Sequence, residues 1–320
     1  MGICYLLKYG AIRNRMKNLT FQNHFNFGRN PDDESEFLIS FGSLQQECVT
    51  PMAEAVRSAQ LIYEDNSSAG VNLLLSGGID SECMAQAFLD AKVPFQATFM
   101  RFKNDLNAFD IQTNVQFCQQ HNIKYSFVDL DIIHFLESGL YLDVADKYEC
   151  QSPQLAAHLW LLDQVDGVPI LGGNPIAPIW KNDHWFYIGA PGELHSTYFK
   201  YFLENERAGV PLFFMYTPEL IASFFSTPVM KDYIEKKINL ESDYSYDHKC
   251  QSYVQGGFNV QPRQDKFTGF ELVRQHYDRL EGTQYGMAFN RLFREPLEKL
   301  FPFPDSYKQL VPQNYFTGRP

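Results

Sequence analysis

Short apolar runs alternate with helical patterns from residue 71 onward, and this alternation most constrains the fold of the chain. The first apolar run, VNLLL at residues 71–75, leads directly into SGGIDS at residues 76–81. Further strands are predicted at residues 95–102, 124–128 and 168–171, and the intervening helices at residues 82–90, 109–121, 132–137 and 154–165. Because each connection is long enough for a crossover, the pattern predicts an α/β fold with a doubly wound, Rossmann-like parallel sheet.

The flanking segments carry weaker patterns. Thr50 and Pro51 predict the start of a helix, because Thr accepts a hydrogen bond at an N-cap and Pro suits the first turn. Beyond residue 175, a strand pair is predicted within residues 180–188, and helices at residues 198–206, 217–226, 229–238 and 269–281. We expect three parts: short strands and loops in residues 1–49, an α/β domain in residues 50–175, and a mostly helical region in residues 176–320.

Charge and cysteine content narrow the class of protein. The chain has 38 acidic and 27 basic residues and a formal net charge of −11, which argues against nucleic acid as a partner. No apolar stretch approaches the roughly 18–20 residues of a membrane span, so we expect no membrane association. The six cysteines are scattered without a C-x-x-C pair, which favours a reduced, cytoplasmic protein over a disulfide or zinc framework.

The segment at residues 76–81 is the best candidate for chemistry. Gly77 and Gly78 allow positive φ and close approach to the backbone, and successive N–H groups in such a turn bind anions. Ser76 and Ser81 add hydroxyl groups, and the following helix directs its positive end to the same point. The interpretation is a phosphate or pyrophosphate cradle, in which Asp80 holds Mg²⁺ (magnesium) or caps the helix. The alternative is an ordinary tight turn with an N-cap.

Residues 73–81 (LLLSGGIDS) resemble the S-G-G-x-D-S pyrophosphate loop of the PP-loop ATP pyrophosphatases, also called the adenine nucleotide alpha hydrolase-like superfamily. The resemblance covers about residues 50–175, which it marks as the ATP-binding domain, and is greatest to the synthetase domain of asparagine synthetases. It implies an ATP-dependent, AMP-forming ligase that uses ATP and Mg²⁺ to adenylate a small-molecule substrate and release pyrophosphate. Ammonia or another nucleophile then displaces AMP.

The same resemblance implies roles for individual residues. Ser76, Gly77, Gly78 and Ser81 would hold the pyrophosphate, with Ile79 in the variable slot, and Asp80 would position the pyrophosphate or its metal. Adenine would be gripped by backbone at the ends of the first two strands, here at Leu74, Leu75, Phe99 and Met100. A basic residue from the C-terminal region would neutralise the phosphates: Lys266, or Arg263 as second choice, unless this is only a solvated charged stretch.

Further candidates lie at the fourth strand and beyond it. Gly172, Gly173 and Asn174 end that strand, so they should face the same crevice, and the alternative is a simple turn. Asn174 stands where asparagine synthetases carry an acid, which weakens a metal role there. Glu193 and His195 could bind a substrate amine or act as a base, although a surface loop is the plainer interpretation.

Other features of the sequence are better explained by structure than by chemistry. His158, Cys150 and Cys250 are expected to be buried core groups. The aromatic residues gather after residue 176 and would fill a core or stack on a ligand. Only 75 residues precede Ser76 and the second residue is Gly2, so we expect no built-in glutaminase. The donor would then be free ammonia or a separate protein.

Other functions and assembly states stay open at this stage. A nucleoside or tRNA modification enzyme, such as a thiolating enzyme of the same superfamily, is one alternative function. A non-catalytic nucleotide-binding protein is another. The aromatic content also leaves room for an oligomer.

Overall fold

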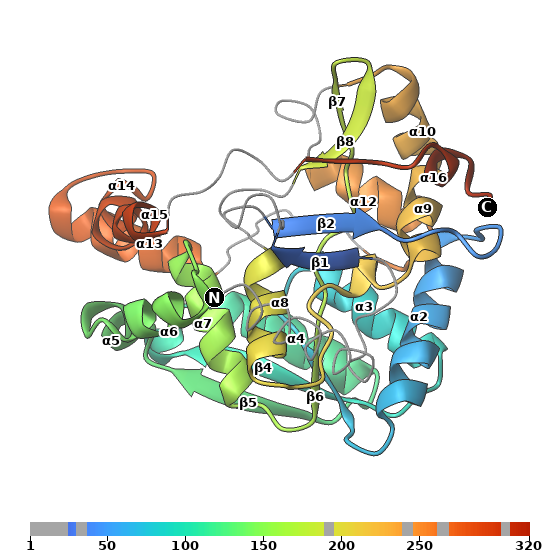
Figure 1. Ribbon diagram of the computed structural model, residues 1–320. Coiled ribbons are helices and arrows are strands. Elements are labelled where there is room, and N and C mark those ends of the chain that lie inside the picture. The colour runs from blue at the N-terminus through green and yellow to red at the C-terminus, as the bar shows by residue number, and fades with distance from the viewer. Residues whose placement is uncertain (1–24, 30–36, 189–194, 239–245, 261–268, 302–307) are drawn as a thin grey trace, which may run out of the picture.

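A parallel sheet of four strands forms the centre of the first half of the chain in the computed structural model (Figure 1). The structure describes residues 25–29, 37–188, 195–238, 246–260, 269–301 and 308–320. In sheet order the strands are β5 (Tyr125–Leu130), β4 (Gln96–Phe102), β3 (Val71–Leu74) and β6 (Val168–Leu171). All neighbouring strands run parallel. The predicted doubly wound α/β fold is therefore confirmed.

Helices connect these strands. They are α2 (Pro51–Asn66) before the sheet, and then α3 (Ile79–Asp90), α4 (Ala108–Gln120), α5 (Ile132–Glu137), α6 (Leu140–Tyr148) and α7 (Pro153–Asp163). The predicted N-cap is confirmed, because Thr50 Oγ1 accepts from the Ala53 N–H over 3.3 Å. One detail of the prediction is wrong, because helix α3 begins at Ile79 rather than near Glu82. Helix α6, which follows the left-handed turn at Gly139, was not predicted.

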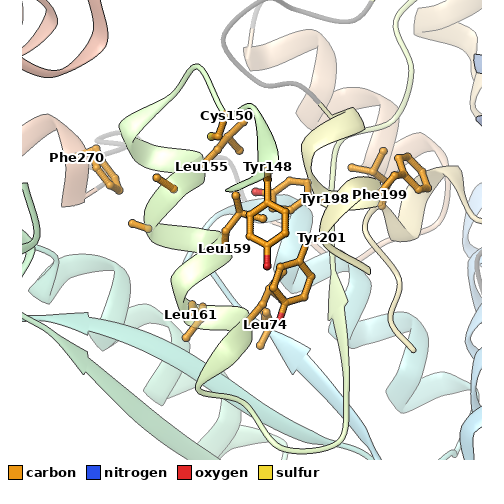
Figure 2. Packing of buried hydrophobic residues seen from close by; sticks show 14 of the residues in the cluster. Leu74, Tyr148, Cys150, Leu155, Leu159, Leu161, Tyr198, Phe199, Tyr201 and Phe270 are labelled. Carbon is orange, nitrogen blue, oxygen red and sulfur yellow. The ribbon is translucent and has the colours of Figure 1, made fainter. Parts of the chain in front are cut away.

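Both faces of the sheet are covered, so each strand contributes to two cores. Leu73 and Leu75 belong to the core that includes residues of α2, α3 and α4, whereas Leu74 belongs to the core of α5, α6 and α7. This explains the continuous apolar run of the first strand, because a strand buried on both faces has no solvent side. Figure 2 shows the second core, in which the rings of Tyr148 and Tyr201 lie 5.3 Å apart between centroids.

The second half of the chain is mostly helical and also carries a small antiparallel sheet. Its helices include α8 (His195–Glu204), α9 (Pro218–Phe225), α10 (Pro228–Glu235), α12 (Tyr246–Gln255), α13 (Gly269–Glu281), α14 (Met287–Phe289), α15 (Glu295–Leu300) and α16 (Gln313–Thr317). The predicted strand pair is β7 (Ile179–Lys181) and β8 (His184–Ile188). Sequence patterns did not indicate α12 or β9 (Lys308–Leu310), which pairs with β8.

Two short one-turn segments complete this half. A 3₁₀ turn, η3 (Phe213–Met215), precedes α9, and a π-helical turn, η4 (Asn290–Arg294), joins α14 to α15. Helices α13, α14 and α15 lie together at one side of the molecule, whereas β7, β8, α10 and α16 lie at the other (Figure 1).

The N-terminal part pairs β1 (Phe25–Arg29) with β2 (Phe37–Phe41) in an antiparallel hairpin. The aromatic residues of the second half mainly fill cores, because Phe199, Phe202 and Phe213 expose 1% or less of their surface. Among the helices of the described residues, none is both long and apolar enough to cross a membrane.

Candidate active site

The segment at residues 76–81 lies where the strand order reverses. From β3 the chain moves to β4 and β5 on one side, and later returns to β6 on the other side of β3. The crevice at such a switch point is the usual ligand site of an open parallel sheet. The end of β6 lies against the first turn of α3, because a Cβ added to Gly172 would be 3.5 Å from Ser81 Cα.

The loop is held by hydrogen bonds among its own residues. Ser81 Oγ donates to the Gly78 carbonyl over 2.9 Å and accepts from the Ser76 N–H over 3.2 Å. The Gly78 N–H lies 3.4 Å from Ser76 Oγ. Gly78 is the N-cap residue of α3 and makes no side-chain cap, so the positive end of that helix opens onto the loop. The loop and the N-terminus of α3 thus lie at one point, and the anion cradle stays a prediction.

Gly77 occupies a position that only glycine suits. Its φ is +79°, and a Cβ there would be 2.6 Å from Asp110 Cβ and 2.7 Å from Asp110 Cα. The loop therefore rests directly against α4. Asp110 Oδ2 in turn accepts from the Gly269 N–H over 3.1 Å, and Asn114 Nδ2 donates to the Leu75 carbonyl over 3.0 Å. Helix α4 thus supports both the loop and the start of α13.

The Asp80 carboxylate receives two donors from α12. Lys249 Nζ lies 2.8 Å from Asp80 Oδ2, and Tyr253 OH donates to Asp80 Oδ1 over 2.7 Å. Lys249 Nζ also lies 3.4 Å from Asn174 Oδ1. The side chains of Lys249 and Asp80 are only 15% and 17% exposed. This polar cluster joins the end of β3, the end of β6 and the C-terminal region at one point.

Hydrogen bonds from neighbouring residues fix the backbone at the strand ends that are expected to bind adenine. The Leu75 N–H donates to the Thr98 carbonyl over 3.1 Å, and the Met100 carbonyl accepts from Asn107 Nδ2 over 2.7 Å. Leu74, Leu75 and Phe99 are buried in the cores, so only their backbone could serve a ligand. A carbonyl oxygen has two lone pairs, so the Met100 carbonyl keeps capacity for a second donor.

The structure describes some of the remaining predicted residues and not others. Gly173 turns with φ +65° against Leu212, and Ile79 is a core residue that exposes 2% of its surface. Arg263, Lys266 and Glu193 lie outside the described residues. His195 is the first residue of α8, and its side chain also lies outside that description. The structure thus brings together the predicted loop and Asn174.

Four contributing residues escaped sequence reasoning: Lys249, Tyr253, Asp110 and Asn114. The pairs Asp110/Asn114 and Lys249/Tyr253 are each spaced by four residues, which places both members on one helix face. For α4, the two residues lie among other polar residues such as Gln112, Thr113 and Gln116, so the pattern did not single them out. For α12, no local pattern pointed to a loop that lies 169 residues earlier in the sequence.

Burial shifts the pKa of two cysteines beside the loop and of one histidine on α7. Burial raises the pKa of the Cys83 thiol well above its ordinary value, with the nearby Asp80 carboxylate adding to the effect, and burial also raises the pKa of Cys250. His158 on α7 packs against Tyr198, whose hydroxyl lies 2.8 Å from His158 Nδ1, and burial lowers the pKa of His158 to about 4. The interpretation of His158 as a core residue fits this packing.

The donor set fits a nucleotide better than a preformed metal centre. Backbone N–H groups, two serine hydroxyls and the Lys249 ammonium suit phosphate oxygens. Among the described residues there is no cluster of three or more His, Cys, Asp or Glu side chains able to hold a metal. Each Asp80 oxygen has lone pairs beyond those used by Lys249 and Tyr253, so Asp80 can add one oxygen ligand to a Mg²⁺ ion carried by phosphates.

Comparison with known proteins finds similarity only among solved structures. No family model and no curated protein matches the sequence. The NH3-dependent NAD synthetase from Campylobacter jejuni is 14% identical with a TM-score of 0.34, over 67% of this chain and 97% of that one. The NMN synthetase from Francisella tularensis is 17% identical with a TM-score of 0.33, over 83% of this chain and 99% of that one.

The glutamine-dependent NAD+ synthetase from Acinetobacter baumannii is 15% identical with a TM-score of 0.31, over 87% of this chain and 55% of that one. These similarities are distant. The fold described above therefore rests on the strand order and connections of this chain itself.

Proposed function

We propose that this protein is an ATP-dependent synthetase that adenylates a small-molecule substrate and releases pyrophosphate. The observation that carries the proposal is the SGGIDS turn at the sheet's switch point, with Lys249 from α12 placed on its carboxylate. Ammonia or another nucleophile then displaces AMP, and the bond formed is most simply carbon–nitrogen, as in an asparagine synthetase. The substrate and the nitrogen donor belong to the proposal, and the arrangement of side chains does not identify them.

The nucleotide would lie across the ends of β3 and β4. The backbone around Leu75 and Met100 would take the adenine, and the N–H groups of residues 76–81 would take the β- and γ-phosphates. The Ser81 hydroxyl, which now closes the loop onto Gly78, would keep the turn in shape. Bound Mg²⁺ would supply charge neutralisation between the phosphates, with Asp80 as its protein ligand.

The chemistry is a displacement at phosphorus. An oxygen of the substrate attacks the α-phosphorus, the bond from that phosphorus to the bridging oxygen breaks, and both electrons leave with pyrophosphate. Negative charge grows on the departing group, where the Lys249 ammonium and the α3 N-terminus can stabilise it. The protein then contributes position and charge rather than a nucleophilic side chain.

Lys266 and Arg263 remain proposed phosphate ligands. The support is the position of the described residues on either side of them. Asn259 exchanges two hydrogen bonds with Gln86 on α3, and the Gly269 N–H donates to Asp110 beside the loop. Lys266 precedes Gly269 by three positions in the sequence, so the described residues nearest to it in the chain lie beside the loop.

The substrate would lie on the side of Asn174, next to the C-terminal region. Asn174 already accepts from Lys249, and its amide nitrogen is a donor that suits an anionic or carbonyl oxygen. Glu193 and His195 remain proposed substrate ligands. We also propose that residues 176–320 determine which substrate binds, because these two residues belong to that region.

The test is a screen for ATP turnover. Purified protein is incubated with ATP, Mg²⁺, ammonia and pools of small carboxylates, amides and nucleobase derivatives, and AMP and pyrophosphate are measured. A substrate is accepted when both products form in equal amounts and the Ser76→Ala variant loses the activity. Formation of ADP and phosphate instead, or full activity in Ser76→Ala, would contradict the proposal.

The tRNA-thiolation alternative has no favouring observation. Cys150 is buried, with its Sγ 3.3 Å from the Ser152 carbonyl, and burial raises its pKa to about 12. Such a thiol is protonated and a poor nucleophile at neutral pH. Salt-dependent binding of RNA would restore this alternative.

A further inference from the structure

A buried tyrosine hydroxyl orients the one carboxylate of the proposed nucleotide loop. Tyr253 OH donates to Asp80 Oδ1, and Lys249 Nζ approaches Oδ2. The two oxygens of Asp80 therefore have different, fixed partners. Tyr253 exposes 0% of its surface, so its hydroxyl has no access to water that could replace Asp80 as an acceptor.

Aromatic rings from three other elements hold the Tyr253 ring in place. Phe214 of η3, Phe224 of α9 and Phe258, which follows α12, have ring centroids 5.2, 5.6 and 5.3 Å from that of Tyr253, all edge-on. Edge-on contacts at such distances are favourable for aromatic pairs, and close packing limits movement of the enclosed ring. The hydroxyl is thus held at a defined point relative to α3.

We propose that Tyr253 is a positioning residue that acts through Asp80. By holding Oδ1, it stops the carboxylate from rotating and keeps Oδ2 toward Lys249 and the metal-bearing phosphates. This inference rests on the proposed function, since it presumes that Mg²⁺ and ATP bind at the loop. Without the hydroxyl, the carboxylate can turn, and both the metal and Lys249 lose a fixed partner.

The chain offers a matched control for the loss of one tyrosine hydroxyl. Tyr201 exposes 1% of its surface, and its hydroxyl donates to Asp163 Oδ1 over 2.7 Å, the same distance as in the Tyr253 pair. Asp163 lies at the end of α7, away from residues 76–81 in the sequence and without a hydrogen bond to them among the described contacts. The Tyr201 hydroxyl also accepts from Arg207 Nη1 over 3.0 Å. Tyr201→Phe therefore removes a tyrosine–aspartate bond like that lost in Tyr253→Phe, and one further bond, but at a position away from the loop.

The experiment measures binding of ATP by calorimetry, with Mg²⁺ and with EDTA, in wild-type protein and both variants, together with thermal unfolding. Tyr253→Phe should weaken binding of Mg²⁺–ATP by about 10-fold or more, since a hydrogen bond to a charged group is lost. Its effect on metal-free ATP should be smaller. Tyr201→Phe should lower thermal stability at least as much as Tyr253→Phe, because Arg207 also loses a partner, but it should leave both affinities within about twofold of wild type.

A double variant tests whether Tyr253 acts through Asp80. In an Asp80→Ala background, Tyr253→Phe should cause no further loss of Mg²⁺–ATP affinity, because the shared partner is gone. Equal affinities of Tyr253→Phe and Tyr201→Phe, or additive losses in the double variant, would overturn the inference while leaving the proposed function intact. If wild-type protein binds no Mg²⁺–ATP, the proposed function itself fails.

Discussion

The Lys249 ammonium lies 2.8 Å from Asp80 Oδ2, although 169 residues separate the two in the chain. This pair connects α12 to the first turn of α3. Both side chains are mostly buried, so screening by solvent is weaker than for an exposed pair. The cation is consequently held at the loop before any ligand arrives.

Lys249→Met should weaken ATP binding. The variant keeps most of the side-chain volume but removes the charge, and it leaves the Asp80 carboxylate without its cation beside incoming phosphates. We expect the affinity for Mg²⁺–ATP to fall by about 10- to 100-fold, measured by calorimetry. Lys236→Met is the control, because Lys236 pairs with Asp232 at the exposed surface of α10. Equal affinities in the two variants would contradict a role for Lys249.

Gly77→Ala and Gly78→Ala should differ sharply. Alanine at Gly77 needs φ near +79° and places a Cβ 2.6 Å from Asp110 Cβ, whereas Gly78 has φ −83° and its nearest atom, Ser76 Oγ, is 3.4 Å away. We expect Gly77→Ala to reduce the free energy of unfolding by about 2 kcal/mol or more, and Gly78→Ala by about 0.5 kcal/mol at most. Denaturant unfolding measures both, and similar losses would contradict the backbone argument.

Because of His158, the free energy of unfolding should fall in mild acid. Burial lowers its pKa to about 4 in the folded protein, below the ordinary value of about 6.5. The unfolded chain therefore binds an extra proton between these values, and stability that is complete above pH 6.5 is lost as the pH falls toward 4, by on the order of 3 kcal/mol. Unfolding at pH 7 and pH 4 measures this difference.

The controls for that experiment are two histidine variants. His158→Asn should flatten the dependence of stability on pH, while His134→Gln, at an exposed position of α5, should leave it unchanged. An unchanged slope in His158→Asn would show that other groups cause the acid sensitivity.

Buried thiols should resist alkylation. Burial raises the pKa of Cys118 and of Cys150 from the ordinary value of 9.0 to about 12, so the thiolate fraction at pH 8 falls about a thousandfold. Mass spectrometry after brief treatment with iodoacetamide should find both unlabelled in native protein and fully labelled in urea. Equal labelling under the two conditions would show that α4 and the segment between α6 and α7 open readily.

The strand–helix alternation was predictable because each element carries its own signal. Residues 71–74 form a buried strand, and Thr50 with Pro51 starts α2, since apolar runs and N-caps act over a few residues. The start of α3 was placed too late, at residue 82, because Asp80 and Ser81 suit a turn as well as a first helical turn. Local patterns could not separate these two alternatives.

Only the part of the candidate site that follows the strands was predictable from the sequence. Residues 76–81 and Asn174 follow strands, and the carboxyl ends of parallel strands meet at one edge, so their proximity followed from the fold class. The supporting groups Asp110 and Asn114 did not follow, because a polar residue on a helix usually faces solvent. Only packing against Gly77 and Leu75 shows that these two face the loop.

By itself, the sequence determined the parallel α/β sheet and the position of a glycine-rich turn at its edge, because period, caps and breakers are local properties of the chain. Tertiary structure alone decided which cation meets that turn. Helix α12 has a polar sequence without a strong apolar stripe, and nothing within it indicates that Lys249 and Tyr253 would lie on Asp80. That contact depends on the packing of Tyr253 against Phe214 and Phe258. Such packing brings together side chains that are distant in sequence, so no local pattern can show it.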